Sequence, residues 1–175
     1  MMGSPISATS PAPPTLDAFE AVLDRHDSAT LALEEWCRSR GLAASPRITA
    51  KLVEGQDQAP APEMQKALNL TPGDRIVMRN VHLSCGARVL SVAWNWYVPQ
   101  RLTPQMNEQL RTTDIPFGKA VADLKFRRRP LSTVPGPALN CPLGTISTHR
   151  AMLMLPDGRP LAYLVECYTA ANLAP

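Results

Sequence analysis

Two alternating hydrophobic runs each carry a charge on the face that should be apolar. The run 76–83 contains Arg79, and the run 161–168 contains Glu166. Successive side chains of a strand point to opposite faces, so each charge shares its face with hydrophobic neighbours. These neighbours are Val77, Val81 and Leu83 for the first charge, and Ala162, Leu164 and Tyr168 for the second. Both charges are therefore expected to point inward, where an unpaired charge loses much of its hydration energy.

Two interpretations account for these inward charges. In the first, Arg79 and Glu166 pair with each other, or one strand is half exposed and its charge meets water. In the second, they belong to a pocket in which the guanidinium holds an anion and the carboxyl handles a proton or a hydroxyl. The strand pattern alone leaves both open.

The order of the other patterns predicts an α+β fold. Helical spacing at 16–23 and 28–40 comes first, with Asp27 or Ser28 as a possible N-cap of the second helix and Gly41 as its possible C-cap. Further short helices are expected at 62–70, from 104 to 110 and from 115 onward, and strands at 47–54, 76–83, 89–98, 146–155 and 161–168. The prolines between 130 and 143 predict a long loop. Helices segregated from an antiparallel sheet form the α+β class.

A chain of 175 residues fits one domain. The segment 1–14, rich in Ser, Pro and Ala, is expected to be a flexible tail, which leaves 15–175 as the single domain. No apolar stretch approaches the roughly 20 residues of a membrane span, and no secretory signal is visible. A soluble, cytoplasmic protein with no membrane span is the prediction.

Neither the cysteines nor the net charge of the sequence indicates a metal site, a redox site or a polyanionic partner. Cys37, Cys85, Cys141 and Cys167 are scattered without metal or dithiol spacing, which predicts reduced thiols. A net charge of +3 does not require a polyanionic partner, and the run of three arginines at 127–129 is expected to be solvated. Without interleaved aromatic residues or a binding motif, no nucleic-acid partner is expected.

Cofactor and metal motifs are missing as well. The sequence has no phosphate-binding glycine loop, dinucleotide fingerprint, metal-ligand spacing or nucleophile elbow, so no cofactor and no metal are expected. The three histidines are isolated. His149 and Arg150 lie on the strand expected to pair with that of Glu166, where they could supply a second anion-binding group.

Four segments in this order resemble the chorismate lyase family, which includes the chorismate pyruvate-lyase of ubiquinone biosynthesis. They are Asp-Ser-Ala-Thr at 27–30, Met-Arg at 78–79, Pro-Phe-Gly at 116–118 where the family has Pro-Leu-Gly, and Gly-Arg-Pro-Leu at 158–161 leading to Glu166. The likeness extends over nearly the whole chain after the tail. Each segment alone is unspecific, but their order and spacing match the family.

The resemblance implies a six-stranded antiparallel sheet with helices on one face and a ligand cavity between the sheet and helical flaps. It assigns Arg79 to the ligand's ring carboxylate, Glu166 to its hydroxyl or to a proton, and Ala29 and Phe117 to the cavity walls. The implied activity is a carbon-oxygen lyase that eliminates pyruvate from chorismate and leaves 4-hydroxybenzoate. This reaction needs no cofactor, and a monomer is expected. A glutamate with a raised pKa suits the proton transfer.

Departures from the family keep two alternatives open. Phe117 replaces a smaller leucine, Ala29 a longer methionine, and Asn95 stands where the best-known members have an arginine. If that arginine holds a second carboxylate, this chain binds a mono-anion, or His149 or Arg150 substitutes. The alternatives are a non-catalytic aromatic-acid sensor of the related UTRA-like fold, since fold does not fix function, and a lyase relative acting on another cyclic carboxylic acid.

Overall fold

The computed structural model describes residues 13–138 and 140–175. Its helices are α1 (Leu16–Asp24), α2 (Ala29–Arg40), α3 (Pro62–Leu68), α4 (Pro104–Thr112) and α5 (Phe117–Ala120). Its strands are β1 (Ile48–Leu52), β2 (Val77–Cys85), β3 (Arg88–Tyr97), β4 (Arg127–Pro135), β5 (Thr145–Met154) and β6 (Pro160–Thr169). The predicted tail at 1–14 lies almost entirely outside the described residues.

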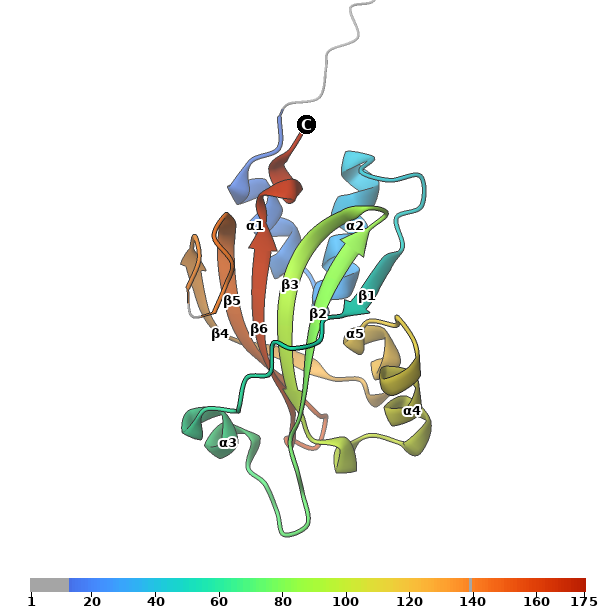
Figure 1. Cartoon of the computed structure of the whole chain (residues 1–175), viewed down its shortest axis with the longest axis vertical. Helices are drawn as coiled ribbons and strands as arrows, with labels where there is room; N and C mark the ends of the chain where they lie inside the picture. The colour runs from blue at the N-terminus through green and yellow to red at the C-terminus, as the bar shows by residue number, and fades with distance from the viewer. Residues whose placement is uncertain (1–12, 139) are drawn as a thin grey trace, which may run out of the picture.

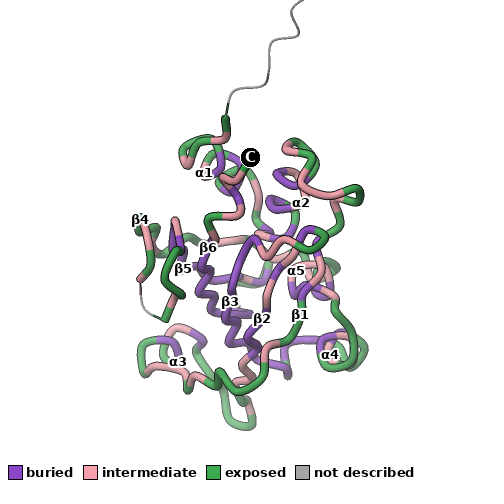
Figure 2. The backbone as a smooth tube through the Cα atoms, turned by 45° about the horizontal axis from the view of Figure 1, so that its top comes forward, coloured by how far each residue is buried: buried purple, intermediate pink, exposed green. Residues whose placement is uncertain are grey.

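The strands form one antiparallel sheet in the order β1-β2-β3-β6-β5-β4 (Figure 1). Hairpins join β2 to β3 and β5 to β6, and their turns contain Gly86 and Gly158, both with positive φ. The predicted α+β class and six-stranded antiparallel sheet are confirmed. The sheet also provides most of the buried backbone (Figure 2).

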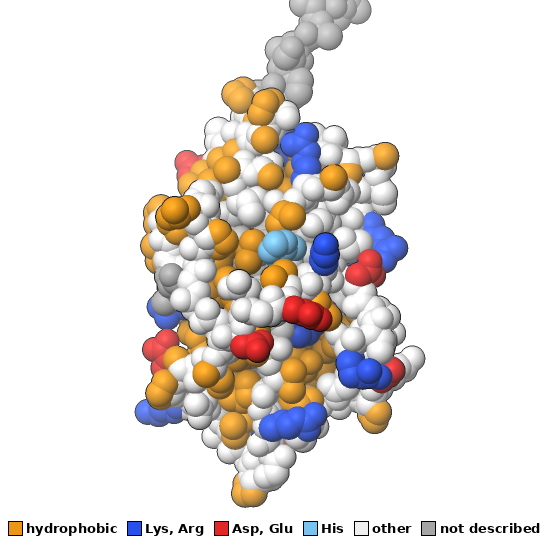
Figure 3. Space-filling model, in the orientation of Figure 1, with side chains coloured by type: hydrophobic (Ala, Val, Ile, Leu, Met, Phe, Trp, Pro, Cys, Tyr) orange, Lys and Arg blue, Asp and Glu red, His pale blue; other side chains and the backbone are white. Residues whose placement is uncertain are grey.

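Helices cover the two sheet faces unequally. Residues of α1, α2, α4 and α5 pack with one face, in two clusters that include Phe19, Trp36 and Leu110. On the opposite face α3 packs its Met64 and Leu68 against Trp94 and neighbouring side chains. Figure 3 shows this second face, where hydrophobic side chains are visible between polar ones. The expectation that helices lie on one face therefore fails for α3.

The structure corrects the prediction of a long loop after residue 130. The segment predicted as a loop at 130–143 begins as β4, which pairs with β5 despite Pro130 and Pro135. As an edge strand β4 leaves one row of its backbone groups without a strand partner, and prolines are tolerated in such strands. A register shift between Pro130 and Ser132 accompanies this pairing.

The cysteines are paired rather than reduced. Cys37 of α2 bonds to Cys85 at the end of β2, and Cys141 bonds to Cys167 of β6. Each disulfide joins segments that are far apart in the sequence, which is why the spacing of the cysteines did not reveal it. No helix among the described residues is long and apolar enough to cross a membrane.

Candidate functional site

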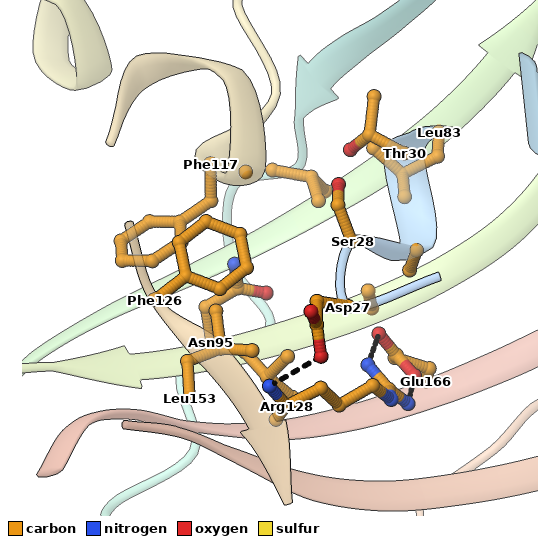
Figure 4. Close-up of a pocket in the computed structure, with 15 residues that line it drawn as sticks. Asp27, Ser28, Thr30, Leu83, Asn95, Phe117, Phe126, Arg128, Leu153 and Glu166 are labelled. Carbon is orange, nitrogen blue, oxygen red and sulfur yellow. Dashed lines mark hydrogen bonds and ion pairs between the residues drawn. The ribbon is translucent and has the colours of Figure 1, made fainter. Parts of the chain in front are cut away.

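A cavity lies between the sheet and the two segments that begin α2 and α5 (Figure 4). Its floor comes from β2, β3, β5 and β6, and its roof from the residues before and within α2, from the start of α5 and from the approach to β4. The lining residues are Asp27, Ser28, Ala29, Thr30, Val81, Leu83, Ala93, Asn95, Phe117, Gly118, Phe126, Arg128, Leu153, Leu164 and Glu166. The cavity volume is about 40 Å³, room for a few water molecules.

The roof segments are held by specific contacts. The Ser28 hydroxyl accepts a hydrogen bond from the backbone N–H of Leu31 and caps α2. The Asp27 carboxylate accepts one from the backbone N–H of Arg128, 3.0 Å away, which ties the start of α2 to β4. Gly118 of α5 lies so close to Ser28 that a Cβ there would be 2.6 Å from its Oγ. The two roof segments therefore depend on a glycine at 118.

We expect Gly118→Ala to lower the free energy of unfolding by about 1 kcal/mol, because the new methyl group displaces the Ser28 hydroxyl from the cap. Chemical denaturation measures this change. Gly144→Ala is a control for a glycine with open space around a Cβ, although its positive φ adds a separate cost. A Ser28→Ala/Gly118→Ala double variant should cost little more than Ser28→Ala alone. Full additivity of the two changes would contradict the proposed contact.

Glu166 is the buried acid of the cavity, and both of its carboxylate oxygens accept hydrogen bonds. Arg128 donates to both of its carboxylate oxygens, with Nη1 3.1 Å from Oε2 and Nη2 2.5 Å from Oε1. The Tyr168 hydroxyl donates to Oε1 at 3.1 Å. Only 4% of the Glu166 side chain and 11% of the Arg128 side chain are exposed, so this is a buried, bidentate ion pair.

The electrostatics of Glu166 differ from the expectation of a raised pKa. Burial by itself raises the pKa of this carboxyl, but the charge and hydrogen bonds of Arg128 outweigh burial and hold the pKa below the usual glutamate value. The pKa of Tyr168 is raised by burial and by the adjacent carboxylate. Glu166 is therefore an ionised hydrogen-bond acceptor, not a proton donor.

Arg79 is buried, as predicted, but it does not line the cavity. Its side chain is on the cavity side of the sheet, opposite Asn95 in the β2–β3 register, and only 5% of the residue is exposed. Nη2 donates to the carbonyl of Ile115 at 3.3 Å, whereas Nε and Nη1 have no hydrogen-bond partner among the described residues. Burial lowers the pKa of Arg79, yet a guanidinium keeps its charge in proteins.

Arg79 lines an adjoining hollow together with Tyr97 and residues of α4. The Tyr97 ring packs against Phe117, which lines the cavity, with ring centroids 5.2 Å apart. The hollow and the cavity therefore adjoin at this pair of rings. Arg79 and Glu166 are two strands apart, each spacing being about 4.8 Å, so they do not pair with each other.

The other predicted residues divide into two groups. Ala29, Asn95 and Phe117 line the cavity with Glu166, in line with their predicted positions. Arg150 does not, because it alternates with His149 along β5 and its side chain bonds to Ser132 and approaches Glu63. The structure therefore does not bring Arg150 to the lining of this cavity, and a role of Arg150 in binding the ligand stays a prediction.

His149 faces the Glu166 side of the sheet but is engaged elsewhere. It lies opposite Glu166 in the β5–β6 register, and its Nε2 is 2.8 Å from the carboxylate of Glu20 on α1. Its ring also packs edge-on against that of Tyr168. Burial raises the pKa of Glu20, but the close contact with His149 and the hydrogen bond from Ser147 outweigh burial, so the pKa lies below the usual glutamate value. His149 therefore packs next to Glu166 and Tyr168 and does not line the cavity.

Arg128 is the site residue that sequence reasoning missed. The run at 127–129 was predicted to be solvated, and its two outer arginines are exposed. The middle one points inward because side chains alternate along β4. A buried Glu166 requires a cation, so the need for a partner was visible in the sequence, but its identity was not.

A second, more polar cavity of about 170 Å³ shares Asp27 and Arg128 with the first. It lies beside the α1–α2 connection and the edge of β4 and β5. The described residues contain no group of three or more His, Cys, Asp or Glu side chains that could hold a metal ion.

Comparison with solved structures defines the class of fold. The chain is similar to the effector domain of PhnF from Mycobacterium smegmatis, with TM-score 0.56 and 15% identity over 82% of this chain and 89% of that one. It is also similar to the ligand-binding domain of a putative GntR-family regulator from Bordetella bronchiseptica, with TM-score 0.52 and 17% identity over 71% and 83%. The chain therefore shares the fold of these two domains, in agreement with the UTRA-like fold expected from the sequence.

A further neighbour is a possible transcriptional regulator, YydK, from Bacillus subtilis, with TM-score 0.51 and 16% identity over 73% of this chain. The chain spans only 60% of that protein. No family model matches the sequence. The uncharacterized protein y4mC of Sinorhizobium fredii is 40% identical over 188 residues, which cover 95% of this chain and 78% of y4mC. The chain belongs to the same family as y4mC.

Proposed function

We propose that this domain binds a small aromatic or cyclic carboxylic acid between the sheet and the roof segments. The observation that carries this proposal is Arg79, a guanidinium that is 5% exposed and has two nitrogens without partners among the described residues. Buried polar groups are nearly always hydrogen-bonded, so such a group marks the place of a missing partner. A carboxylate matches the planar fork of arginine.

The remainder of the site fits the other end of such a ligand. The cavity floor offers Val81, Ala93 and Leu164 to a ring, and Glu166 offers an acceptor to a hydroxyl group. A ligand that reaches from Glu166 to Arg79 must displace the Phe117 ring, which closes the passage by packing on Tyr97. The names of the structural neighbours, effector domain and ligand-binding domain, support a sensing role.

We expect Arg79→Met to weaken the binding of 4-hydroxybenzoate by about 10- to 100-fold, since a hydrogen bond to a charged group contributes about 1.5–3 kcal/mol. The same change should not lower the free energy of unfolding of the free protein, because it removes an unpaired buried charge. Calorimetric titration and chemical denaturation measure the two effects. Arg75→Met, which changes an exposed arginine of the same hollow, is the matched control. Undiminished affinity of Arg79→Met would refute the proposal.

The second candidate is the chorismate lyase reaction. It is favoured by the fact that Ala29, Phe117 and Glu166, which belong to the segments resembling that family, line one cavity. In this reaction the bond between the ring carbon and the enolpyruvyl oxygen breaks. The hydrogen of the neighbouring, hydroxyl-bearing ring carbon ends on the methyl group of the released pyruvate, and the ring becomes aromatic. Arg79 would orient the ring carboxylate, and Glu166, as a carboxylate, would accept a proton or hold the hydroxyl group.

Incubation of the protein with chorismate, followed by measurement of pyruvate and 4-hydroxybenzoate, separates the two candidates. A lyase releases both products in equal amounts, and Glu166→Gln should then lower turnover more than substrate affinity. If the protein is a sensor, 4-hydroxybenzoate should bind to it and raise the melting temperature of the protein, and no pyruvate should be released from chorismate. A relative that acts on another cyclic acid would bind neither chorismate nor its product tightly.

A further inference from the structure

We infer that Arg128 is a positioning residue that holds Glu166 as an oriented carboxylate, so that the site selects ligands whose far end donates a hydrogen bond. This inference rests on the proposed function and specifies its ligand class as hydroxy or amino derivatives of the acid. It concerns a residue of β4 that the resemblance to the chorismate lyase family does not include.

The contacts of Glu166 leave one acceptor position free. Each carboxylate oxygen can accept about two hydrogen bonds. Oε1 accepts from Nη2 of Arg128 and from the Tyr168 hydroxyl, whereas Oε2 accepts only from Nη1 of Arg128 among the described residues. Glu166 lines the cavity (Figure 4). The inference assigns the remaining position on Oε2 to a hydroxyl donated by the ligand.

The bidentate contact also fixes the carboxylate in space. Two parallel N–H···O bonds restrict rotation of both groups, and Tyr168 adds a third bond from the same strand as Glu166. Arg128 is itself placed by its backbone bond to Asp27. The acceptor is therefore oriented before a ligand arrives, which reduces the cost of binding.

Without Arg128, Glu166 would be a carboxyl in a buried site with only Tyr168 donating to it. Burial then favours the protonated form, which has an O–H donor and accepts a hydrogen bond more weakly than a carboxylate does. The charged and titratable groups around this carboxyl are Arg128 from β4, Tyr168 from β6, His149 from β5 with its partner Glu20 from α1, and Asp27 from the α1–α2 connection. Asp24, the last residue of α1, interacts with Arg128. Removing Arg128 should therefore make recognition of the hydroxyl depend on pH.

The test compares 4-hydroxybenzoate with 4-fluorobenzoate, which is similar in size but has no donor at that end. In the unchanged protein the hydroxy acid should bind about 10- to 100-fold more tightly, with a ratio that stays constant from pH 5 to pH 8. In Arg128→Met the ratio should fall to within about 3-fold at pH 5 and recover as the pH rises and Glu166 ionises. If Arg128→Met only destabilised the site, the affinities for both acids should fall by the same factor, and their ratio should not change with pH.

Two further variants keep the result decisive. Arg129→Met removes the adjacent exposed arginine and should leave the ratio and its pH dependence unchanged. Arg128→Met/Glu166→Gln removes both buried charges, so it should fold even if Arg128→Met does not, and its ratio should be low at every pH. A pH-dependent ratio in this double variant would show that another group titrates and would overturn the inference.

The outcomes separate this inference from the proposed function. If the unchanged protein binds neither acid, both fail. If it binds 4-hydroxybenzoate but Arg128→Met keeps the full preference from pH 5 to pH 8, only the role of Arg128 fails. Equal affinities for the two acids in the unchanged protein also overturn the inference, because Glu166 would then not accept a hydrogen bond from the ligand hydroxyl.

Discussion

Glu166→Gln should lower the free energy of unfolding by about 3–5 kcal/mol at pH 7, because it leaves the Arg128 guanidinium buried without its counter-charge. Arg128→Met should lower the free energy of unfolding by a similar amount, because it leaves the Glu166 carboxylate buried without its counter-charge. The double variant Arg128→Met/Glu166→Gln should recover most of the loss, since no buried charge is left unpaired. Denaturation in urea measures all three. Costs that simply add would show that the ion pair does not couple these residues.

A matched control is the exposed pair between Glu108 and Arg111 on α4, where 59% and 70% of the side chains are accessible. Glu108→Gln should change stability by no more than about 0.5 kcal/mol, because exposed ion pairs contribute little. The contrast between the two glutamates therefore measures the effect of burial.

The same ion pair predicts an acid-sensitive contribution to stability. The pKa of Glu166 in the folded protein lies below its usual value, so folding is favoured by its ionised form. This contribution is complete above the usual glutamate pKa and is lost as the pH falls through the lower, folded pKa. Unfolding free energies at pH 7 and pH 3 should therefore differ more in the unchanged protein than in the double variant.

Reduction of the disulfides should have the second large effect. Cys37 and Cys85 are 48 residues apart, and Cys141 and Cys167 are 26 apart. From loop-closure entropy, opening them should lower the free energy of unfolding by about 4 and about 3.5 kcal/mol. Cys37→Ala/Cys85→Ala and Cys141→Ala/Cys167→Ala isolate the two contributions.

The first disulfide also bears on the site, because it ties α2, whose start roofs the cavity, to β2, whose Val81 and Leu83 floor it. Loss of this bond should weaken ligand binding more than loss of the second. Thiol labelling of the denatured, unreduced protein checks the pairing directly. Detection of four free thiols would contradict it.

Strand periodicity predicted the parts of the site that depend on local structure. Alternation along β2 and β6 placed Arg79 and Glu166 on the cavity side of the sheet. The same rule, applied to β5, would have separated Arg150 from His149. The cap at Ser28 was also predictable, because capping depends on the residues that follow it directly.

Contacts between distant segments could not be predicted in this way. Prolines obscured β4, and without β4 the arginine run at 127–129 appeared to be a solvated loop rather than an alternating strand. The cysteine pairs likewise depend on which strands become neighbours. Arg79 faces the predicted side of the sheet, yet it lines the hollow that contains Tyr97, whose ring packs against Phe117 of the cavity.

The sequence by itself determined which side chains face inward, since the direction of a side chain in a strand depends only on its position in an alternating run. It thereby determined that the interior holds an arginine and a glutamate. Only the tertiary structure decided their partners. Arg128 meets Glu166 across 38 residues because β4 and β6 flank the same strand. Arg79 donates to the carbonyl of Ile115, a residue outside the sheet, and its Nε and Nη1 have no hydrogen-bond partner among the described residues.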